Sequence, residues 1–310
     1  MMRLGVVDFL AFSRVCKSWR SLALSNMNMF IVSRPPMSVS ISTDANHESK
    51  CYLEDFEGRK LKISLPHSDY KACVGVSYGY LILLRAKTND FWLMNPITRH
   101  EFHVPFPFLN VRSCTSFLGA ILVFSPLISG WVFVVFDRYF HKIWFVIFGK
   151  REWTYVTTHF SILDLHAFRG KIYTLHLDNF LSEMRLFPTP EVTLLEFNNF
   201  LKPNRRYPRL VSLGEKLYVI NRISEFPYMI QEINFSKMEW VSCEKTVEEY
   251  AFFLSSDYCF SAFIRIETWV DLYSQYGKHS FPDKNGKGKL FRAKMWYFFH
   301  DCLNVNFLHQ

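Results

Sequence analysis

The pattern of apolar positions divides the chain into a short helical start and a long β-rich body. Between Asp8 and Ala23 the apolar residues recur at three- and four-residue spacing, which predicts one amphipathic helix with Asp8 as its cap. From Cys51 to about Phe260, short apolar runs alternate with turn residues, which is typical of successive β-strands. Because an isolated helix of this length is marginal in water, its apolar face docks either on its own domain or on a partner.

Turn-and-strand phrases recur along the body at a nearly regular distance. A glycine followed by an apolar strand begins at Gly79, Gly170 and Gly214, and more weakly at Gly119. Spacings of roughly 40 to 50 residues are typical of the four-stranded blades of a β-propeller, in which each small sheet buries its faces against its neighbours. We therefore predict a mainly β fold, a β-propeller-like repeat body preceded by a short α-helical segment.

One long uncharged stretch leaves two interpretations open. No charged residue occurs from Ser113 to Phe136, and this length alone is compatible with a membrane-spanning helix. However, Ser125-Pro126 and Ser129-Gly130 interrupt its middle as a turn does, and the flanking runs have the size of buried strands. We favour two core strands joined by a turn, and we expect no membrane partner.

Composition supports a packed β protein and adds a positive charge. Of the 310 residues, 49% are hydrophobic and 18% are aromatic, and the net charge is +8. Such a charge suits nucleic acid, an anionic membrane or an acidic protein, but the basic residues are spread over both ends rather than along one face. A basic nucleic-acid-binding β protein is therefore an alternative hypothesis. We do not favour it, and we expect a protein rather than nucleic acid as the partner. The seven cysteines form no CxxC pair, which favours a reducing compartment, the cytoplasm or the nucleus.

The candidate chemical motifs do not predict an enzyme. His100 and His103 would point to opposite faces of one strand, and His159, His166 and His176 lack the spacing of a zinc site. The stretch 285–289 lacks the spacing of a phosphate-binding loop. The tryptophans at positions 131, 144, 153 and 240 are expected in the core of the blades. We therefore predict no catalytic residues, no metal and no cofactor.

Two parts of the sequence resemble a known family. Residues 8–23, DFLAFSRVCKSWRSLA, resemble the second half of an F-box. The body resembles the domain of unknown function 295, which follows the F-box in a large plant family. The phrases that carry this second resemblance are CVGVSYGYLILL (73–84), FWLMNPITRHEFHVP (91–105), FRGKIYTL (168–175), LGEKLYVINR (213–222) and INFSKMEWV (233–241).

The resemblance implies a partner and a division of the chain. F-box helices bind a Skp-type adaptor within a cullin ubiquitin ligase, and the following domain recruits an unknown substrate protein. By position, the family assigns Leu10, Val15, Cys16, Trp19 and Arg20 to the adaptor-binding F-box, and the apolar stripe adds Phe12. The expected layout is a partial F-box helix at 1–25, a linker at 26–50, a β-propeller-like domain at 51–260 and a diverged or incomplete segment at 261–310.

This leads to two alternative functions. The first is a non-enzymatic substrate-recognition adaptor of an SCF-type E3 ubiquitin ligase. The second is a truncated paralogue, or a free-standing protein-interaction domain without coupling to the ligase. The second alternative follows from the F-box itself, whose usual opening L-P-x-x-L helix does not occur in this sequence.

Overall fold

A computed structural model provides the structure of the chain. It describes residues 6–32, 36–43, 49–55, 58–65, 67, 70–85, 88–108, 118–138, 141–150, 152–177, 180–199, 208–213, 215–222, 228–243, 250–255, 261–265, 280–282, 289–293 and 295–297.

The N-terminal region contains two helices, where the periodicity predicted one. Helix α1 spans Val6–Val15 and helix α2 spans Lys17–Val32, with Cys16 between them. Asp8 lies within the first turn of α1 and is therefore not its cap. The prediction was wrong because the apolar spacing continues through Cys16. The thiol of Cys16 accepts the backbone N–H of Trp19 at 3.5 Å, which satisfies one donor in the first turn of a new helix.

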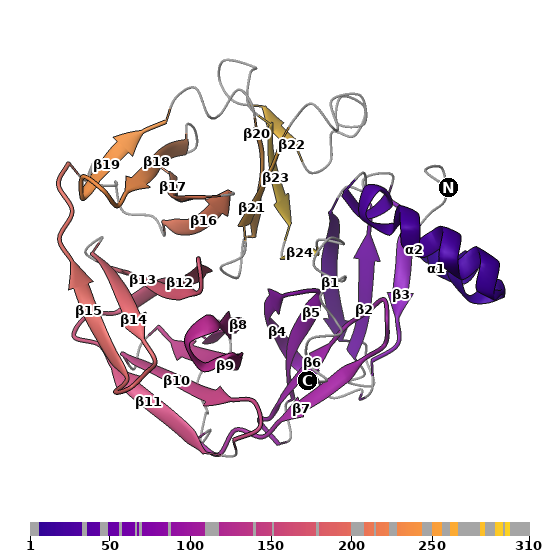
Figure 1. The fold of residues 1–310 in the computed structure, drawn as a ribbon, viewed down its shortest axis with the longest axis horizontal. Helices are drawn as coiled ribbons and strands as arrows, with labels where there is room; N and C mark the ends of the chain where they lie inside the picture. The colour runs from indigo at the N-terminus through magenta and orange to yellow at the C-terminus, as the bar shows by residue number, and fades with distance from the viewer. Residues whose placement is uncertain are drawn as a thin grey trace.

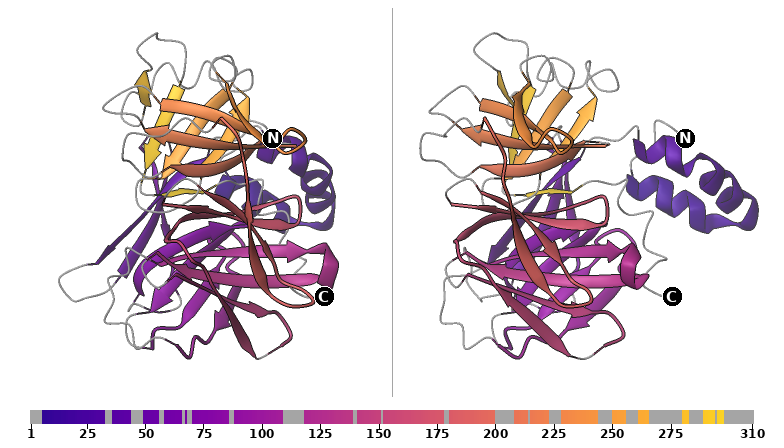
Figure 2. Two further views of the ribbon diagram at one scale, coloured as in Figure 1. Left: turned by 90° about the vertical axis from the view of Figure 1, so that its left-hand side faces the viewer. Right: turned by 60° about the vertical axis from the view of Figure 1, so that its left-hand side comes forward.

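The two helices form an antiparallel hairpin. The ring of Phe9, near the start of α1, stacks on the ring of Phe30, near the end of α2, with centroids 3.9 Å apart. At the other end of the hairpin, the rings of Phe12 and Trp19 stack at 4.4 Å. Phe9, Ala23 and Phe30 are completely or almost completely buried. The hairpin projects from one side of the body, next to its first sheet (Figure 2).

Within the described residues, the strands form six four-stranded sheets, arranged as the blades of a ring (Figure 1). From the innermost strand outward, blade 1 is β24 (Met295–Tyr297), β1 (Met37–Thr43), β2 (Ser49–Glu54) and β3 (Lys60–Ile63). Blade 2 is β4 (Tyr70–Ser77), β5 (Tyr80–Arg85), β6 (Phe91–Met94) and β7 (Glu101–Val104). Blade 3 is β8 (Leu118–Ser125), β9 (Gly130–Asp137), β10 (Lys142–Ile147) and β11 (Trp153–Thr157).

The other three blades continue the ring. Blade 4 is β12 (Ile162–Phe168), β13 (Lys171–His176), β14 (Leu181–Arg185) and β15 (Glu191–Leu195). Blade 5 is β16 (Arg209–Leu213), β17 (Lys216–Arg222), β18 (Tyr228–Asn234) and β19 (Glu239–Ser242). Blade 6 is β21 (Ser261–Arg265), β20 (Tyr250–Ser255), β23 (Lys289–Ala293) and β22 (Ser280–Pro282), with β20 and β23 parallel. This arrangement confirms the predicted mainly β, propeller-like fold.

The ring is closed by pairing the two ends of the body within blade 1. Strand β24 pairs antiparallel with β1, and Tyr297 lies opposite Met37. Tyr297 is fully buried, and its hydroxyl donates to the carbonyl of Gly79 in blade 2 at 3.0 Å. Strand β24 also contacts β20 of blade 6 and β4 of blade 2. Blade 1 therefore joins its two neighbours through a strand that comes from the far end of the sequence.

Two segments differ from the expected layout. The segment 26–50, expected to be a linker, contains the end of α2, the whole of β1 and the start of β2. The segment 261–310, expected to be diverged or incomplete, contributes β21 to β24, which lie in blades 6 and 1. In blade 1, β1 pairs with its neighbour β2 and also with β24, which is distant in the sequence, so this second pairing has no local signal.

The repeating glycines mark the turn that follows the innermost strand. Gly79 and Gly170 have positive φ angles of 75° and 72° and lie at this turn in blades 2 and 4, whereas Gly214 lies outside the described residues. Gly119 was wrongly included in this set, because it lies inside β8. In blade 3 the turn is the 3₁₀ helix η2 (Pro126–Ile128), after which Ser129 takes the left-handed conformation with φ of 46°.

The uncharged stretch is the two-stranded core element that we predicted. Its described part consists of β8, η2 and β9, and β8 pairs antiparallel with β9 from Leu118 to Ser125. Over the part of the chain that the structure describes, we find no helix long and apolar enough to cross a membrane. The predicted core tryptophans also lie in or against the core: Trp131 and Trp240 are buried, and Trp144 and Trp153 pack against the cluster between blades 2 and 3.

Neighbouring blades contact each other at equivalent positions. The buried carboxylate of Asp164 in β12 accepts the backbone N–H of Leu210 in β16 at 2.7 Å. Two residues further along both strands, Nε2 of His166 lies 2.9 Å from the hydroxyl of Ser212. Both contacts join residues 46 positions apart, so the two innermost strands run side by side in the same direction. This offset is the structural repeat behind the spacing seen in the sequence.

Candidate functional site

The projecting helical hairpin carries a row of exposed apolar side chains. Trp19, Leu22 and Met29 of α2 recur at three- and seven-residue spacing and are 44%, 51% and 63% exposed, and Val15, the last residue of α1, is 62% exposed at the junction with α2. Residues at this spacing lie on one side of a helix. Ala23 and Phe30 lie beside this row and are buried in the hairpin. One apolar face of the hairpin is therefore buried between its two helices, and an adjacent row of apolar side chains is exposed to solvent. An exposed apolar row of this kind is typical of a surface that binds a protein partner.

The structure places the six predicted adaptor-binding residues at different depths. Val15, Cys16, Trp19 and Arg20 are exposed around the junction of the two helices. Phe12 is half-buried because its ring stacks on Trp19. Leu10 lies in α1, and its side chain is outside the described part of the structure. The structure thus brings Phe12, Val15, Cys16, Trp19 and Arg20 together at one end of the hairpin.

Met29 extends the row beyond the residues singled out from the sequence. We ended the sequence-predicted helix near Ala23, whereas α2 continues to Val32. The signal was available, because Leu22 and Met29 continue the spacing that begins at Val15 and Trp19. Leu24 is also 58% exposed, but its position along the helix places it on a different side.

The helix that carries the row is positively charged. Lys17 and Arg20 are exposed, and the sequence of α2 contains no carboxylate. Two cations beside an apolar row favour a partner with an acidic surface, since complementary charge steers encounter and discriminates among partners.

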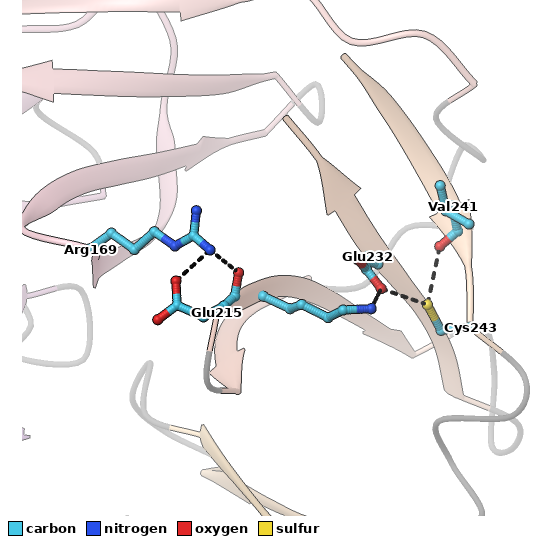
Figure 3. A network of polar contacts seen from close by, with 6 residues as sticks. Arg169, Glu215, Glu232, Val241 and Cys243 are labelled. Atoms are coloured by element: carbon cyan, nitrogen blue, oxygen red, sulfur yellow. Dashed lines mark hydrogen bonds and ion pairs between the residues drawn. The ribbon is translucent and has the colours of Figure 1, made fainter. Parts of the chain in front are cut away.

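A network of polar contacts lies on the surface of blades 4 and 5 (Figure 3). The guanidinium of Arg169 donates to the backbone carbonyl of Glu215 at 2.8 Å and forms an ion pair with its carboxylate. Lys216 contacts Glu232 at 2.8 Å, and the thiol of Cys243 donates to the same carboxylate at 3.9 Å. Each of these two carboxylates is paired with a cation, so the network links neighbouring strands and the adjacent blade, with the small stabilisation typical of exposed ion pairs.

The same kind of pairing recurs over the body. The cations that lie within 4 Å of a carboxylate include Arg59, Lys60, Arg169, Lys171, Arg185, Lys216 and Lys237. Part of the positive charge is therefore neutralised locally on the body, whereas the sequence of α2 supplies no carboxylate of its own.

The histidines are separated into local contacts. The hydroxyl of Tyr80 lies 2.8 Å from Nδ1 of His100, whereas Nε2 of His103 lies 3.1 Å from the carboxylate of Asp90. Burial lowers the pKa of His166 to about 4, so this imidazole is neutral at pH 7. Burial also lowers the pKa of His176, whose Nε2 contacts two hydroxyl groups. A search for three or more clustered metal-ligating side chains, confined to the described residues, finds none.

The buried cysteines are held as thiols. Cys51 and Cys73 lie in the apolar cluster between blades 1 and 2. Burial raises the pKa of Cys51 to about 12, and it also raises the pKa of Cys73 above its usual range. A thiol with a raised pKa is a poor nucleophile, so these two residues contribute packing rather than reactivity.

Comparison with known proteins assigns a family to each part of the chain. Residues 51–263 match the model of the KIB1-4 beta-propeller, and residues 1–30 match the model of the F-box domain. The search of curated proteins finds no match. The F-box match and the exposed row of α2 thus fall on the same segment.

Several solved structures are similar to the chain, at low sequence identity and with TM-scores below 0.5. One is a catalytically inactive virginiamycin B lyase from Staphylococcus aureus with quinupristin, at 10% identity and a TM-score of 0.42, covering 69% of this chain and 72% of that chain. Another is the WD40 domain of SCAP from fission yeast, at 12% identity and a TM-score of 0.40, covering 68% of this chain and 57% of that chain. A protein of unknown function from Bacteroides caccae shows 10% identity and a TM-score of 0.42, covering 70% of this chain and 76% of that chain.

Proposed function

We propose that this chain, which belongs to the KIB1-4 beta-propeller family and carries an F-box domain, is a substrate-recognition subunit of an SCF-type E3 ubiquitin ligase. F-box and β-propeller domains together are typical of non-enzymatic adaptors. The observation that carries the proposal is the exposed apolar row on the F-box hairpin, which projects away from the ring (Figure 2).

In this proposal each part of the chain has one task. The hairpin binds a Skp-type adaptor through Phe12, Val15, Cys16, Trp19 and Arg20, together with Leu22 and Met29 of the same row. The ring from Met37 to Tyr297 holds a substrate protein, and other subunits of the cullin ligase catalyse ubiquitin transfer. The mechanism is proximity, because the receptor raises the local concentration of the substrate beside the ligase. The proposed compartment is the cytoplasm or the nucleus.

The two family descriptions agree in extent. The resemblance to the domain of unknown function 295 covers residues 51–260, and the KIB1-4 beta-propeller match covers 51–263. We therefore propose that both refer to the same ring and that the protein comes from a plant.

The proposal is tested by measuring the affinity of the full chain for a purified plant Skp-type adaptor. A Val15→Ala, Trp19→Ala double variant should bind at least about tenfold more weakly, since truncating central aromatic anchors costs about 2 kcal/mol or more. Leu22→Ser tests the row independently of the Phe12–Trp19 stack and should also weaken binding. The matched control is Leu24→Ala, an equally exposed leucine on another side of α2, which should bind within about twofold of the unmodified chain.

Two outcomes would contradict the ligase function. If the intact chain does not bind the adaptor while helix content by circular dichroism is normal, the chain is a free-standing interaction domain or a truncated paralogue. If the row variants bind as well as the intact chain, the adaptor does not use this surface.

A further inference from the structure

A hydroxyl residue followed by proline occurs twice in this sequence, at Ser125-Pro126 and at Thr189-Pro190. A proline-directed protein kinase requires this pair of residues in its substrate. Proline has no backbone N–H, so it enters an apolar kinase pocket without an unpaired donor, whereas any other residue would bury one there. Since the kinase also needs an accessible hydroxyl group, the surroundings of each dipeptide decide whether it can be used.

The dipeptide Ser125-Pro126 is held inside blade 3. Ser125 is the last residue of β8, pairs with Gly130 of β9 and is only 4% exposed. Pro126 begins η2, and the N–H of Ser129 donates to its carbonyl at 3.2 Å. Pro126 also packs on the next blade, where a Cβ at Gly170 would lie 2.8 Å from its ring. A kinase therefore reaches Ser125 only after blade 3 has come apart.

The dipeptide Thr189-Pro190 lies instead at the tip of a β-hairpin in the outer half of blade 4 (Figure 1). Residues 186–190 connect β14 to β15, and Arg185 lies opposite Glu191 at the base of this loop. Residues 187–189 are exposed. The hydroxyl residue of this dipeptide is therefore open to an enzyme in the folded protein.

Few contacts hold this tip in place. Leu186 anchors the start of the loop by packing against the apolar cluster between blades 3 and 4. For residues 187–189 we find no hydrogen bond to any other described residue. The tip can therefore extend into the cleft of a kinase while β14 and β15 stay paired, which is a local opening of low free energy. Exposed loop tips also give other modifying enzymes, such as proteases, access to a folded chain.

A phosphate group on Thr189 would meet a cation at the base of the loop. Residues 186–190 carry no charge of their own. The guanidinium of Arg185 forms an ion pair with the carboxylate of Glu191, and these side chains are 51% and 45% exposed. Such an exposed pair is weak, whereas arginine binds a phosphate more strongly because a phosphate has nearly two negative charges and three acceptor oxygens. The phosphate can therefore compete with Glu191 for Arg185.

We propose that Thr189 is a phosphorylation site for a proline-directed serine/threonine kinase. A bond forms between Oγ1 of Thr189 and the γ-phosphorus of ATP, the bond from that phosphorus to the β,γ-bridging oxygen breaks, and ADP leaves. The hydroxyl proton passes to a carboxylate of the kinase. The modification places nearly two negative charges in an uncharged loop, beside Phe187, which is 54% exposed. The proposal does not depend on adaptor binding, because Thr189 belongs to the ring and not to the F-box hairpin.

Phosphorylation of the full chain by a purified mitogen-activated protein kinase, with Mg²⁺ and ATP, tests the proposal. Mass spectrometry should find phosphate on Thr189 and on neither of two control residues in the same chain. Ser125 precedes a proline but is buried, and Thr193 is exposed in β15 but precedes Leu194. Phosphate on either control at the same rate would overturn the proposal. So would an unmodified Thr189 while a standard protein substrate is phosphorylated in the same reaction.

Two proline variants separate the sequence requirement from simple exposure. Pro190→Ala should lower the rate of phosphorylation at Thr189 by about tenfold or more, because the new N–H loses its hydration without gaining a partner in the kinase. Pro188→Ala, at the other exposed proline of the same loop, is the matched control and should stay within about twofold of the unmodified chain. Equal rates for Pro190→Ala and the unmodified chain would overturn the proposal.

The same site can be measured in cells. The full chain, purified from plant cells treated with an inhibitor of serine/threonine phosphatases, should carry phosphate on Thr189, and Pro190→Ala should carry little or none. If the unmodified chain carried no phosphate on Thr189 under these conditions, the proposal would be overturned. That result would leave the ligase function unaffected, since adaptor binding is measured separately on the hairpin.

Discussion

At the scale of single residues, the seams between blades tolerate little added volume. Gly75 lies in β4, where a Cβ atom would stand only 2.1 Å from the carbonyl oxygen of Ala120 in the next blade. Real Cβ atoms do not approach an oxygen so closely, so any side chain at this position must push blades 2 and 3 apart. The glycine is required here by the distance between two backbones.

The first prediction concerns this seam. Gly75→Ala should lower the free energy of unfolding by about 1 to 3 kcal/mol, measured by urea denaturation, because overpacking displaces the neighbouring backbone. Gly130→Ala is the matched control, since its Cβ would meet no atom closer than 3.5 Å. If Gly75→Ala were as stable as Gly130→Ala, blades 2 and 3 would be able to move apart at this seam without a loss of stability.

The second prediction concerns the junction of the helices. The thiol of Cys16 accepts the N–H of Trp19, as an N-cap side chain does. Because hydroxyl groups cap better than a thiol or a methyl group, Cys16→Ser should protect the Trp19 amide from hydrogen exchange more than Cys16→Ala, by about 1 kcal/mol. Equal protection in the two variants would contradict the capping role.

At the scale of elements, a neutral histidine joins two innermost strands. Nε2 of His166 in β12 contacts the hydroxyl of Ser212 in β16, and burial lowers its pKa from 6.5 to about 4. As the pH falls, the imidazole of His166 is therefore protonated at a higher pH in the unfolded chain than in the folded chain. The resulting stability is complete above pH 6.5 and is lost as the pH falls towards about 4.

The third prediction follows from this loss of stability at low pH. The urea midpoint of the unmodified chain should fall between pH 7 and pH 4.5, and His166→Gln should show a smaller fall because it removes one of the groups that gain a proton on unfolding. If His166→Gln retained the same pH dependence, its imidazole would not be the group responsible.

Elements with local signals could be predicted from the sequence, and those completed by distant partners could not. The turns at Gly79 and Gly170 were identified because a glycine there takes a positive φ angle. The equivalent turn in blade 3 was identified from Ser125-Pro126 and Ser129-Gly130 but was not recognised as part of the glycine-led repeat, because Ser129 takes the left-handed conformation there. The predicted adaptor-binding residues included Val15 and Trp19 but not Met29, because the predicted helix ended near Ala23 although Leu22 and Met29 continue the same spacing and α2 extends to Val32.

At the scale of the whole molecule, the ring depends on one short strand. The spacing of turns predicted blades, but no local pattern predicts that Met295–Tyr297 pairs with Met37–Val39, because more than 250 residues separate the two strands. This closure joins the first and the last blade. It also buries the ring of Tyr297 completely in the cluster between blades 1 and 2.

The fourth prediction tests this closure. Tyr297→Ala should lower the free energy of unfolding by about 3 to 5 kcal/mol, as expected for a large cavity in a core, whereas Tyr297→Phe should lose only about 1 kcal/mol with its hydrogen bond. Tyr155→Ala, at a 55% exposed tyrosine of β11, should have an effect within about 0.5 kcal/mol. A Tyr297→Ala variant as stable as Tyr155→Ala would show that the ring does not need β24 to be stable.

The pairing of β24 with β1 also sets an order of events during synthesis. Strands β1 to β3 leave the ribosome first, but their inner edge has no partner until Tyr297 has been added. At about 5 to 20 residues per second, translation from Ile63 to Tyr297 takes roughly 10 to 50 s. During this interval the nascent first blade exposes unpaired backbone groups that chaperones can bind and that a neighbouring nascent chain on the same messenger can mispair with.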